Sequence, residues 1–318
     1  MHPMRRFDAA ATRAGLPLAA LIEALRRQFA EGCEVPPRHV HALAGADGQP
    51  AGSVLIMPAW QPGRYLGIKT VNVFPGNAAR GLPGLHATYV LYDASTGVPL
   101  ASLDGNEITA RRTAAASALA TSFLTPPDAS HLLVVGAGRV AALLPQAYAA
   151  VRPIRQVRVW NRSPAAAAAL AADWRAQGLD AQAVDGLEDA VRAADIVSCA
   201  TLARAPLVRG AWLRPGSHLD LIGSFAPDMR EADGDALRDA RVYVDTLEAP
   251  TKAGDLLAAV AEGAWQPDAL CGTLTELCRG QAPALPLPSG RTVFKSVGSA
   301  LEDLAAAMLV FAGPGRGG

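Results

Sequence analysis

The feature that most restricts the fold is an alternation of short apolar runs with helical segments in the second half of the chain. After residue 105 an alanine-rich helical pattern leads into five apolar runs separated by helix-forming sequence: HLLVVGAG, QVRVWNRS, ADIVSCAT, SHLDLIGS and ARVYVDT. Continuous apolar strands that alternate with helices are typical of a parallel sheet covered on both faces. This pattern predicts an α/β fold for the second half of the chain.

The first third of the chain has a different pattern. Residues 15 to 31 place apolar side chains at helical spacing, and residues 38 to 104 contain short β-like runs separated by turn residues. Near the C-terminus, RTVFKSVGSALEDLAAAMLVF has the pattern of a short strand followed by a helix. We therefore predict a helix and an antiparallel sheet before the α/β part, with a C-terminal helix that can pack on either part.

The composition limits the classes of partner and ligand. Half of the residues are hydrophobic, 18% are charged, and the formal net charge is zero. This balance leaves no basic surplus for nucleic acid, and no apolar run reaches the roughly 18 residues of a membrane span. The cysteines lack metal-ligand spacing and no histidine belongs to a recognisable triad, so we predict no metal and no hydrolytic chemistry. We expect a cytoplasmic protein with reduced cysteines and with neither nucleic-acid nor membrane partners.

The run HLLVVGAGRVA, residues 131 to 141, leads from an apolar strand through a GxGxxA turn into an apolar helix. Gly136 permits the tight turn, Gly138 lets the backbone approach a pyrophosphate, and Ala141 lets helix and strand pack closely. A purely structural glycine turn is the alternative, but the position at the start of a βα series favours dinucleotide binding. Pro145 is unexpected inside the following helix, where proline costs roughly 3 kcal/mol.

The end of the second strand of this series selects the cofactor. A site for NAD(H) would place Asp or Glu there to bind the ribose 2′-hydroxyl, whereas this chain has Asn161, Arg162 and Ser163. Without a carboxylate nothing repels a 2′-phosphate, and Arg162 can pair with it while its two neighbours donate hydrogen bonds. NADP(H) is therefore favoured over NAD(H), the alternative being that Arg162 is a solvated arginine at a strand end.

Basic residues occur in two uncommon settings. Lys69, one of only three lysines, lies in the strand-like run LGIKTVNVF on the same face as Val71 and Val73, where an unpaired amine would be costly to bury. Arg111 and Arg112 lie in the first turns of a predicted helix, where the helix dipole disfavours cations. A nearby anion would resolve this conflict, but the residues alone do not say which arginine faces it.

Five motifs follow one another along the chain: GIKTVN at 67 to 72, ARRTAAASALAT at 110 to 121, VVGAG at 134 to 138, VWNRS at 159 to 163 and TVFKSVG at 292 to 298. Together they resemble the ornithine cyclodeaminase/mu-crystallin family over roughly residues 35 to 312. The resemblance implies a Rossmann NAD(P)-binding domain, residues 113–299, inserted into an α+β substrate-binding and dimerisation domain, residues 1–112 plus 300–318. It also implies an oxidoreductase that acts on a small amino or imino acid as a homodimer.

The resemblance also assigns site residues by position. It places Lys69, as the catalytic residue, and Arg112 in the substrate pocket, and it matches Arg38, which follows a stiff Pro-Pro pair, to the arginine that clamps the substrate carboxylate. Lys69 would then be an ammonium satisfied by ligand instead of by a protein carboxylate. The cofactor-binding residues that it implies are Thr88, Gly136, Gly138, Asn161, Arg162, Ser163, Thr201 and Ser296.

One departure from the family pattern bears on the reaction. Ornithine-cyclising members carry an acidic residue in a GGDCPG-like turn, and this chain has IGSFAPDMRE, with Phe225 or, after a one-residue shift, Ser224 at that place. Neither takes a proton from an ammonium near neutral pH, and Asp228 lies three residues after Phe225. We therefore predict an NADPH-dependent reductase of a cyclic or open 2-imino acid, of the Δ1-pyrroline- or Δ1-piperideine-2-carboxylate type.

Two other functions remain open from the sequence. One is an ornithine cyclodeaminase, which forms proline and ammonia, or a related amino-acid dehydrogenase. The other is a non-catalytic NADPH-dependent small-molecule binding protein, which would take up ligand and cofactor without steady-state consumption of NADPH.

Overall fold

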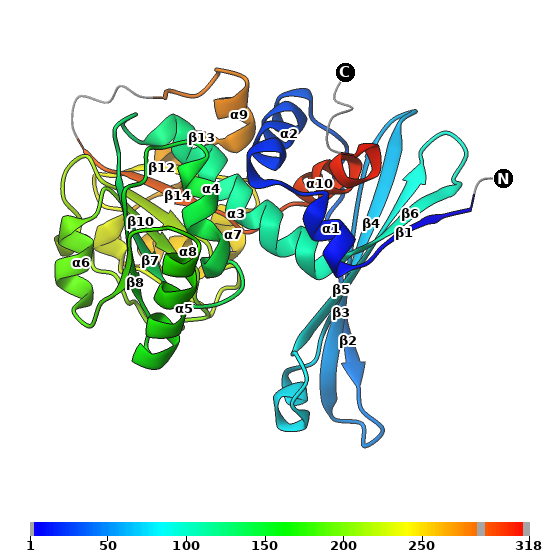
Figure 1. The fold of residues 1–318 in the computed structure, drawn as a ribbon, viewed down its shortest axis with the longest axis horizontal. Helices are drawn as coiled ribbons and strands as arrows, with labels where there is room; N and C mark the ends of the chain where they lie inside the picture. Colours follow the sequence, from blue (N-terminus) through cyan, green and yellow to red (C-terminus); the bar gives the residue numbers. More distant parts are fainter. Residues whose placement is uncertain (1–2, 285–289, 314–318) are drawn as a thin grey trace. The chain divides into compact units, whose positions relative to one another are not determined.

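The computed structural model describes residues 3–284 and 290–313 of the 318-residue chain. It divides into two compact units, one of Met1–Arg112 with Ser299–Gly318 and the other of Thr113–Gly298 (Figure 1). The chain therefore leaves the first unit within a helix, builds the whole second unit, and returns to the first unit just before its last helix.

The first unit contains a six-stranded sheet in the order β1-β6-β5-β4-β3-β2. Its strands are β1 (Arg5–Phe7), β2 (His39–Ala44), β3 (Pro50–Gln61), β4 (Tyr65–Val73), β5 (Leu85–Asp93) and β6 (Pro99–Asp104). Neighbouring strands from β2 to β6 are antiparallel, as predicted, and β1 joins β6 in parallel. The pattern did not predict β1 and β2, because their residues are mostly exposed and show no alternation of burial.

Helices cover one face of this sheet. The helical elements of the first unit are α1 (Ala9–Ala14), α2 (Leu18–Glu31), η1 (Pro75–Arg80), the first turns of α3 (Gly105–Leu124), and α10 (Ala300–Ala312). The C-terminal helix α10 packs on α2 and on strands β3, β4 and β5. Its small alanine side chains allow close approach, so even Glu302 and Asp303 in its first turn are fully buried. Acidic residues are favourable at this end of a helix.

The second unit contains an eight-stranded sheet in which all strands are parallel, in the order β13-β12-β14-β11-β10-β7-β8-β9. The strands are β7 (His131–Val135), β8 (Gln156–Trp160), β9 (Ala181–Ala183), β10 (Ile196–Cys199), β11 (His218–Leu221), β12 (Arg241–Val244), β13 (Leu270–Thr273) and β14 (Thr292–Lys295). Every residue of β10, β11 and β14 is buried, as expected for strands covered on both faces. The predicted α/β fold is confirmed.

Short helices surround this sheet (Figure 1). Besides the rest of α3, they are η2 (Ala141–Leu143), α4 (Leu144–Ala149), α5 (Pro164–Ala176), α6 (Leu187–Ala193), η3 (Gly210–Trp212), η4 (Gly234–Ala236), α7 (Ala249–Lys252), α8 (Gly254–Ala261), η5 (Pro267–Ala269) and α9 (Leu274–Cys278). The expectation that Pro145 lies in the interior of a helix is wrong, because α4 begins at Leu144 and Pro145 lies in its first turn. Proline needs no N–H donor there.

The order of the strands reverses between β7 and β10. From β7 the chain adds β8 and β9 on one side, and then adds β10 and β11 on the other. In open α/β sheets this reversal leaves a crevice at the carboxyl ends of the two central strands, where dinucleotides bind. Within the described residues no helix is long and apolar enough to cross a membrane, and none of the four cysteines forms a disulfide bond.

Candidate functional site

Lys69 lies on the covered face of the six-stranded sheet. It is directly opposite Met57 of β3 and Tyr89 of β5, so the three side chains point to the same face. Lys69 is 2% exposed and Tyr89 is 1% exposed. Val71 is buried on the same face, while Val73 at the end of the strand is only partly buried.

Two carboxylates of α10 neutralise the buried cations of this unit. The Lys69 Nζ atom lies 2.5 Å from Asp303 Oδ2 and donates a longer hydrogen bond of 3.4 Å to Thr109 Oγ1. Arg112 donates from Nε to Asp303 Oδ1 at 3.0 Å and from Nη1 to Glu302 Oε2 at 2.7 Å. The expectation that no protein carboxylate satisfies Lys69 is therefore wrong. The reason is long-range packing, since Asp303 comes from the opposite end of the chain.

Burial and charge together set the protonation of this cluster. Desolvation lowers the pKa of Lys69, neighbouring Arg112 adds to this shift and Asp303 opposes it, so that the pKa lies at about 8. Burial alone would raise the pKa of Asp303, but Lys69 and Arg112 hold it below its ordinary value. Lys69 is thus the cation of the cluster that can gain or lose a proton near neutral pH, because the pKa of Arg112 is raised.

The structure distinguishes the two adjacent arginines of α3. Arg112 is 6% exposed and joins the cluster, whereas Arg111 donates from Nε to the carbonyl oxygen of Leu16. Arg38 is partly buried and lies directly before β2. Thr88 precedes Tyr89 on β5, so its side chain is on the opposite face from Lys69, where it is exposed. The structure therefore brings Lys69 and Arg112 together but leaves Thr88 apart from them.

The glycine turn of the second unit lies at the reversal point of its sheet. Gly136 has a φ of 118°, and a Cβ on it would lie 2.5 Å from the carbonyl oxygen of Ala200, at the end of the neighbouring strand. Only glycine fits there. Gly138 is exposed, and a Cβ on it would meet nothing within 4 Å, so its backbone is open to a bound pyrophosphate. The donors and spacing present at this turn fit a dinucleotide.

The end of β8 offers polar groups and no carboxylate. Ser163 caps α5 by accepting a hydrogen bond from the Ala166 backbone at 3.4 Å, and Asn161 donates to the Ser163 carbonyl oxygen at 3.2 Å. Arg162 between them is exposed. These residues form a polar turn at the start of α5, where the helix dipole favours an anion such as a phosphate.

In the turn after β11, neither of the two positions that the resemblance aligns with the acidic residue of ornithine-cyclising members carries a carboxylate. Ser224 is fully buried and donates to Asp255, while Phe225 is 50% exposed. Asp228 forms a surface ion pair with Arg204 at 3.3 Å.

Of the remaining predicted cofactor residues, Thr201 is partly buried and Ser296 is buried. Thr201 donates from its backbone and its hydroxyl group to Glu231, and Ser296 is buried at 5% exposure. The buried carboxylates Glu231, Glu302 and Asp303 are not among the site residues predicted from the sequence. The last two had a usable signal, since adjacent acidic residues open an otherwise apolar helix.

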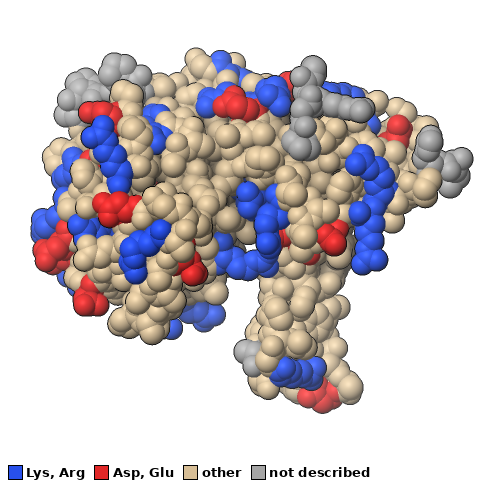
Figure 2. Space-filling view, viewed as in Figure 1, with Lys and Arg blue, Asp and Glu red and all other residues tan. Residues whose placement is uncertain are grey.

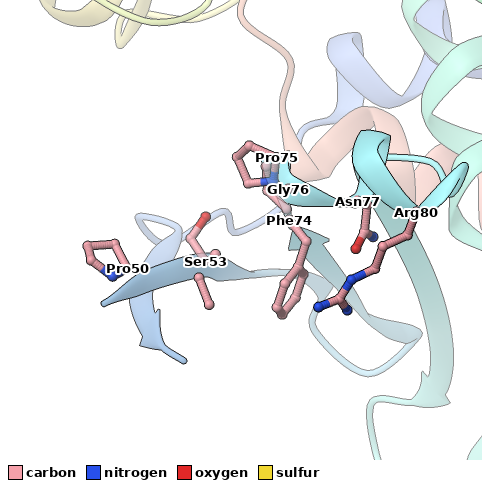
Figure 3. A pocket seen from close by; sticks show the side chains of 10 residues that line it. Pro50, Ser53, Phe74, Pro75, Gly76, Asn77 and Arg80 are labelled. Carbon is pink, nitrogen blue, oxygen red and sulfur yellow. The ribbon is translucent and has the colours of Figure 1, made fainter. Parts of the chain in front are cut away.

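A separate cavity of about 550 Å³ lies in the first unit where β3, β4 and η1 meet (Figure 3). Ser53, Phe74, Asn77 and Arg80 line it, and Figure 3 shows Phe74 and Arg80 projecting to the same side. Lys69 does not line this cavity. We therefore do not assign the cavity to the cluster around Lys69.

Comparison with known proteins identifies close relatives along most of the chain. The model of the ornithine cyclodeaminase/mu-crystallin family matches residues 11–313. A Δ1-pyrroline-2-carboxylate reductase of Paracoccus denitrificans is 44% identical over 259 residues, covering 81% of this chain and 82% of the relative. Ketimine reductase mu-crystallin of Rattus norvegicus is 37% identical over 262 residues, covering 82% and 80% of the two chains.

A solved structure extends this likeness to the fold. The Δ1-pyrroline-2-carboxylate reductase of Thermococcus litoralis, solved with NADH and L-proline, superposes with a TM-score of 0.89. The two proteins are 31% identical, and the match covers 97% of this chain and 96% of the other.

Asp303 is expected to hold the cluster together. Replacing Asp303 with alanine leaves Lys69 without its carboxylate and removes one of the two carboxylates that Arg112 contacts. Breaking a buried ion pair in this way costs roughly 3–5 kcal/mol, which urea unfolding would measure. The control is Glu188→Ala, which breaks an exposed pair with Arg192 and is expected to cost at most about 1 kcal/mol. Equal losses of unfolding free energy in the two variants would contradict the role of Asp303 in holding the cluster together.

Proposed function

The chain belongs to the ornithine cyclodeaminase/mu-crystallin family, and from that premise we propose that it is an NAD(P)H-dependent reductase of a 2-imino acid. The substrate class is the Δ1-pyrroline- or Δ1-piperideine-2-carboxylate type of ketimine. The relatives named above include reductases of such imines. The observation that carries the proposal is the buried Lys69, whose pKa is lowered to about 8 beside the guanidinium of Arg112.

The residues of the first unit bind substrate and supply a proton in this proposal. Two nitrogens of Arg112 contact α10, which leaves Nη2, among the contacts of the described residues, to bind the substrate carboxylate with help from Arg38. The Lys69 ammonium would donate a proton to the imine nitrogen. The neutral Lys69 amine would then take up a proton from solvent, which the neighbouring carboxylate of Asp303 favours. Bound NAD(P)H would supply the hydride that adds to the imine carbon.

The residues of the second unit hold the cofactor in this proposal. The backbone at Gly136 and Gly138 would bind the pyrophosphate. Asn161, Arg162 and Ser163 would bind a 2′-phosphate, so we propose a preference for NADP(H) over NAD(H). The absence of a carboxylate from this turn supports that preference, whereas three similar solved structures contain NADH or NAD.

Reduction of an imine is favoured over cyclodeamination of ornithine by the turn after β11. Its buried hydroxyl group, on Ser224, is already bonded to Asp255, and its outward side chain, Phe225, is apolar. Neither group can accept a proton from a substrate ammonium near neutral pH. An apolar side chain also fits a substrate that lacks a second amine.

Turnover tests the proposed function directly. NADPH oxidation, followed by absorbance, is expected with Δ1-pyrroline-2-carboxylate or Δ1-piperideine-2-carboxylate, with a higher kcat/KM for NADPH than for NADH. The variant Lys69→Ala should lose roughly 100-fold or more in kcat, the usual range for loss of a general acid. Lys252→Ala, at a partly exposed pair with Glu248, is the matched control.

Two results would contradict this function, and a third would contradict the role of Lys69. Proline and ammonia formation from ornithine with NAD+, together with silence toward the imines, would identify a cyclodeaminase. Stoichiometric uptake of NADPH and ligand without turnover would identify a binding protein. A Lys69→Ala variant within about threefold of wild type would remove Lys69 from the chemistry.

The pH profile tests the role of the Lys69 proton. A lysine whose pKa is about 8 is mostly ammonium below that pH and mostly neutral amine above it. If the ammonium donates the proton, kcat/KM falls as the pH rises through about 8. In Lys69→Arg the side chain stays charged, so this fall should be absent from its residual activity. The same fall in both proteins would assign the titration to another group.

We also propose that the protein is a homodimer that associates through the β2 side of the first unit. β2 is an edge strand, and the apolar residues Val40, Leu82 and Leu85 of this unit are each at least 43% exposed. Figure 2 shows few charged residues on the visible surface around β2 and β3. Sedimentation velocity should find a dimer at micromolar concentration, shifted toward monomer by Val40→Asp. A monomeric wild-type protein would contradict the proposal.

A further inference from the structure

One buried carboxylate joins two loops at the carboxyl edge of the parallel sheet. Glu231 is 0% exposed, and its Oε1 atom accepts hydrogen bonds from the Thr201 backbone at 2.7 Å and the Thr201 hydroxyl group at 2.8 Å. Its Oε2 atom accepts from the Gly223 backbone at 2.6 Å. Thr201 follows β10 and Gly223 follows β11, so Glu231 fixes the distance between the two loops.

These loops pack against each other and against the glycine turn without spare room. A Cβ on Gly223 would lie 1.9 Å from the carbonyl oxygen of Thr201. A Cβ on Gly136 would lie 2.5 Å from the carbonyl oxygen of Ala200 and 3.2 Å from Thr201 Cγ2. Since the three segments are in direct contact, a shift of the Thr201 loop changes the surface beside the glycine turn.

A second set of buried groups contacts the backbone of Glu231. Asp255 Oδ1 accepts from the backbone N–H of Glu231 at 2.8 Å and of Ala232 at 3.0 Å. The other oxygen of Asp255 accepts from Ser224 and lies 3.8 Å from Lys295 Nζ. Asp255 and Lys295 are both at most 1% exposed. Glu231 is therefore fixed at its backbone as well as at its carboxylate.

We propose that Glu231 is a positioning residue for the nicotinamide half of the bound dinucleotide, and this inference rests on the proposed function. The strand order places β8 on one side of β7 and places β10 and β11 on the other. The adenosine half belongs at the end of β8, where Arg162 lies, so the loops after β10 and β11 face the other half of the cofactor. Glu231 acts through these loops and touches no reacting atom.

The geometry requires a carboxylate at this position. Thr201 and Gly223 present N–H donors to two different oxygens of the side chain. A glutamine has a single acceptor oxygen, and its amide nitrogen would face one of these donors. Glu231→Gln therefore keeps the size of the side chain while it breaks the tie between the two loops.

The test compares two ligands on the full-length protein. NADPH affinity is measured by fluorescence titration, and affinity for 2′,5′-ADP, which represents the adenosine half alone, by calorimetry. In Glu231→Gln the Kd of NADPH should rise roughly tenfold, as for loss of a hydrogen bond to a charged group, while the Kd of 2′,5′-ADP stays within about twofold. Burial raises the pKa of Glu231 to about 8, so the titrations are run above that pH.

Asp220→Asn is the matched control. Asp220 is also 0% exposed and accepts from three hydroxyl groups, those of Ser117, Tyr148 and Ser198, but these partners lie on α3, α4 and β10 and not in the two loops. The variant Asp220→Asn should lower the Tm and leave the ratio of the Kd of NADPH to the Kd of 2′,5′-ADP unchanged.

The remaining outcomes distinguish failure of the positioning role of Glu231 from failure of the proposed function. Equal losses for both ligands in Glu231→Gln, or a lower Tm with unchanged Kd values, would overturn the positioning role. Wild-type protein that binds neither ligand nor NADH would instead overturn the proposed function. If Glu231→Gln does not fold, Gly223→Ala provides the same test, because its Cβ pushes the two loops apart while Glu231 remains. A Gly223→Ala protein with an unchanged ratio would overturn the inference.

Discussion

The ion-pair cluster of Lys69, Arg112, Glu302 and Asp303 is the interaction on which the first unit depends. Two cations, from β4 and α3, meet two carboxylates from α10 in an interior where any one of them alone would be unstable. The cluster thereby joins the C-terminal helix to a sheet built from the N-terminal part of the chain. The four side chains can be buried together because their two positive and two negative charges cancel.

The same burial that makes the cluster costly lowers the pKa of Lys69. An exposed lysine is mostly charged up to about pH 10, whereas burial, the dominant cause, brings the pKa of Lys69 to about 8. Asp303 opposes this shift, so the side chain stays an ammonium at neutral pH while still able to give up a proton. In the proposed reduction a proton donor of this kind matches an imine nitrogen, which becomes basic as hydride reaches the adjacent carbon.

Buried ion pairs stabilise the first unit, whereas close backbone packing fixes the loops of the second unit. Gly136 and Gly223 let three loops pack in direct contact at the reversal point of the parallel sheet, and Glu231 ties two of them. Buried carboxylates recur here because loops at the end of a parallel sheet leave N–H groups without strand partners, and a carboxylate can accept from several of them. The rigidity of the crevice depends on these polar ties.

The sequence by itself determined the elements whose cause is local. The apolar runs of β7, β8 and β10, the glycine turn at Gly136 and the strand face of Lys69 follow from periodicity and from the backbone freedom of glycine. Only the tertiary structure decided which carboxylate pairs with Lys69, that Arg112 and not Arg111 is buried, and that Glu231 joins two loops. These features depend on side chains that are distant in sequence, and their contacts are set by the packing of whole elements, which no local pattern records.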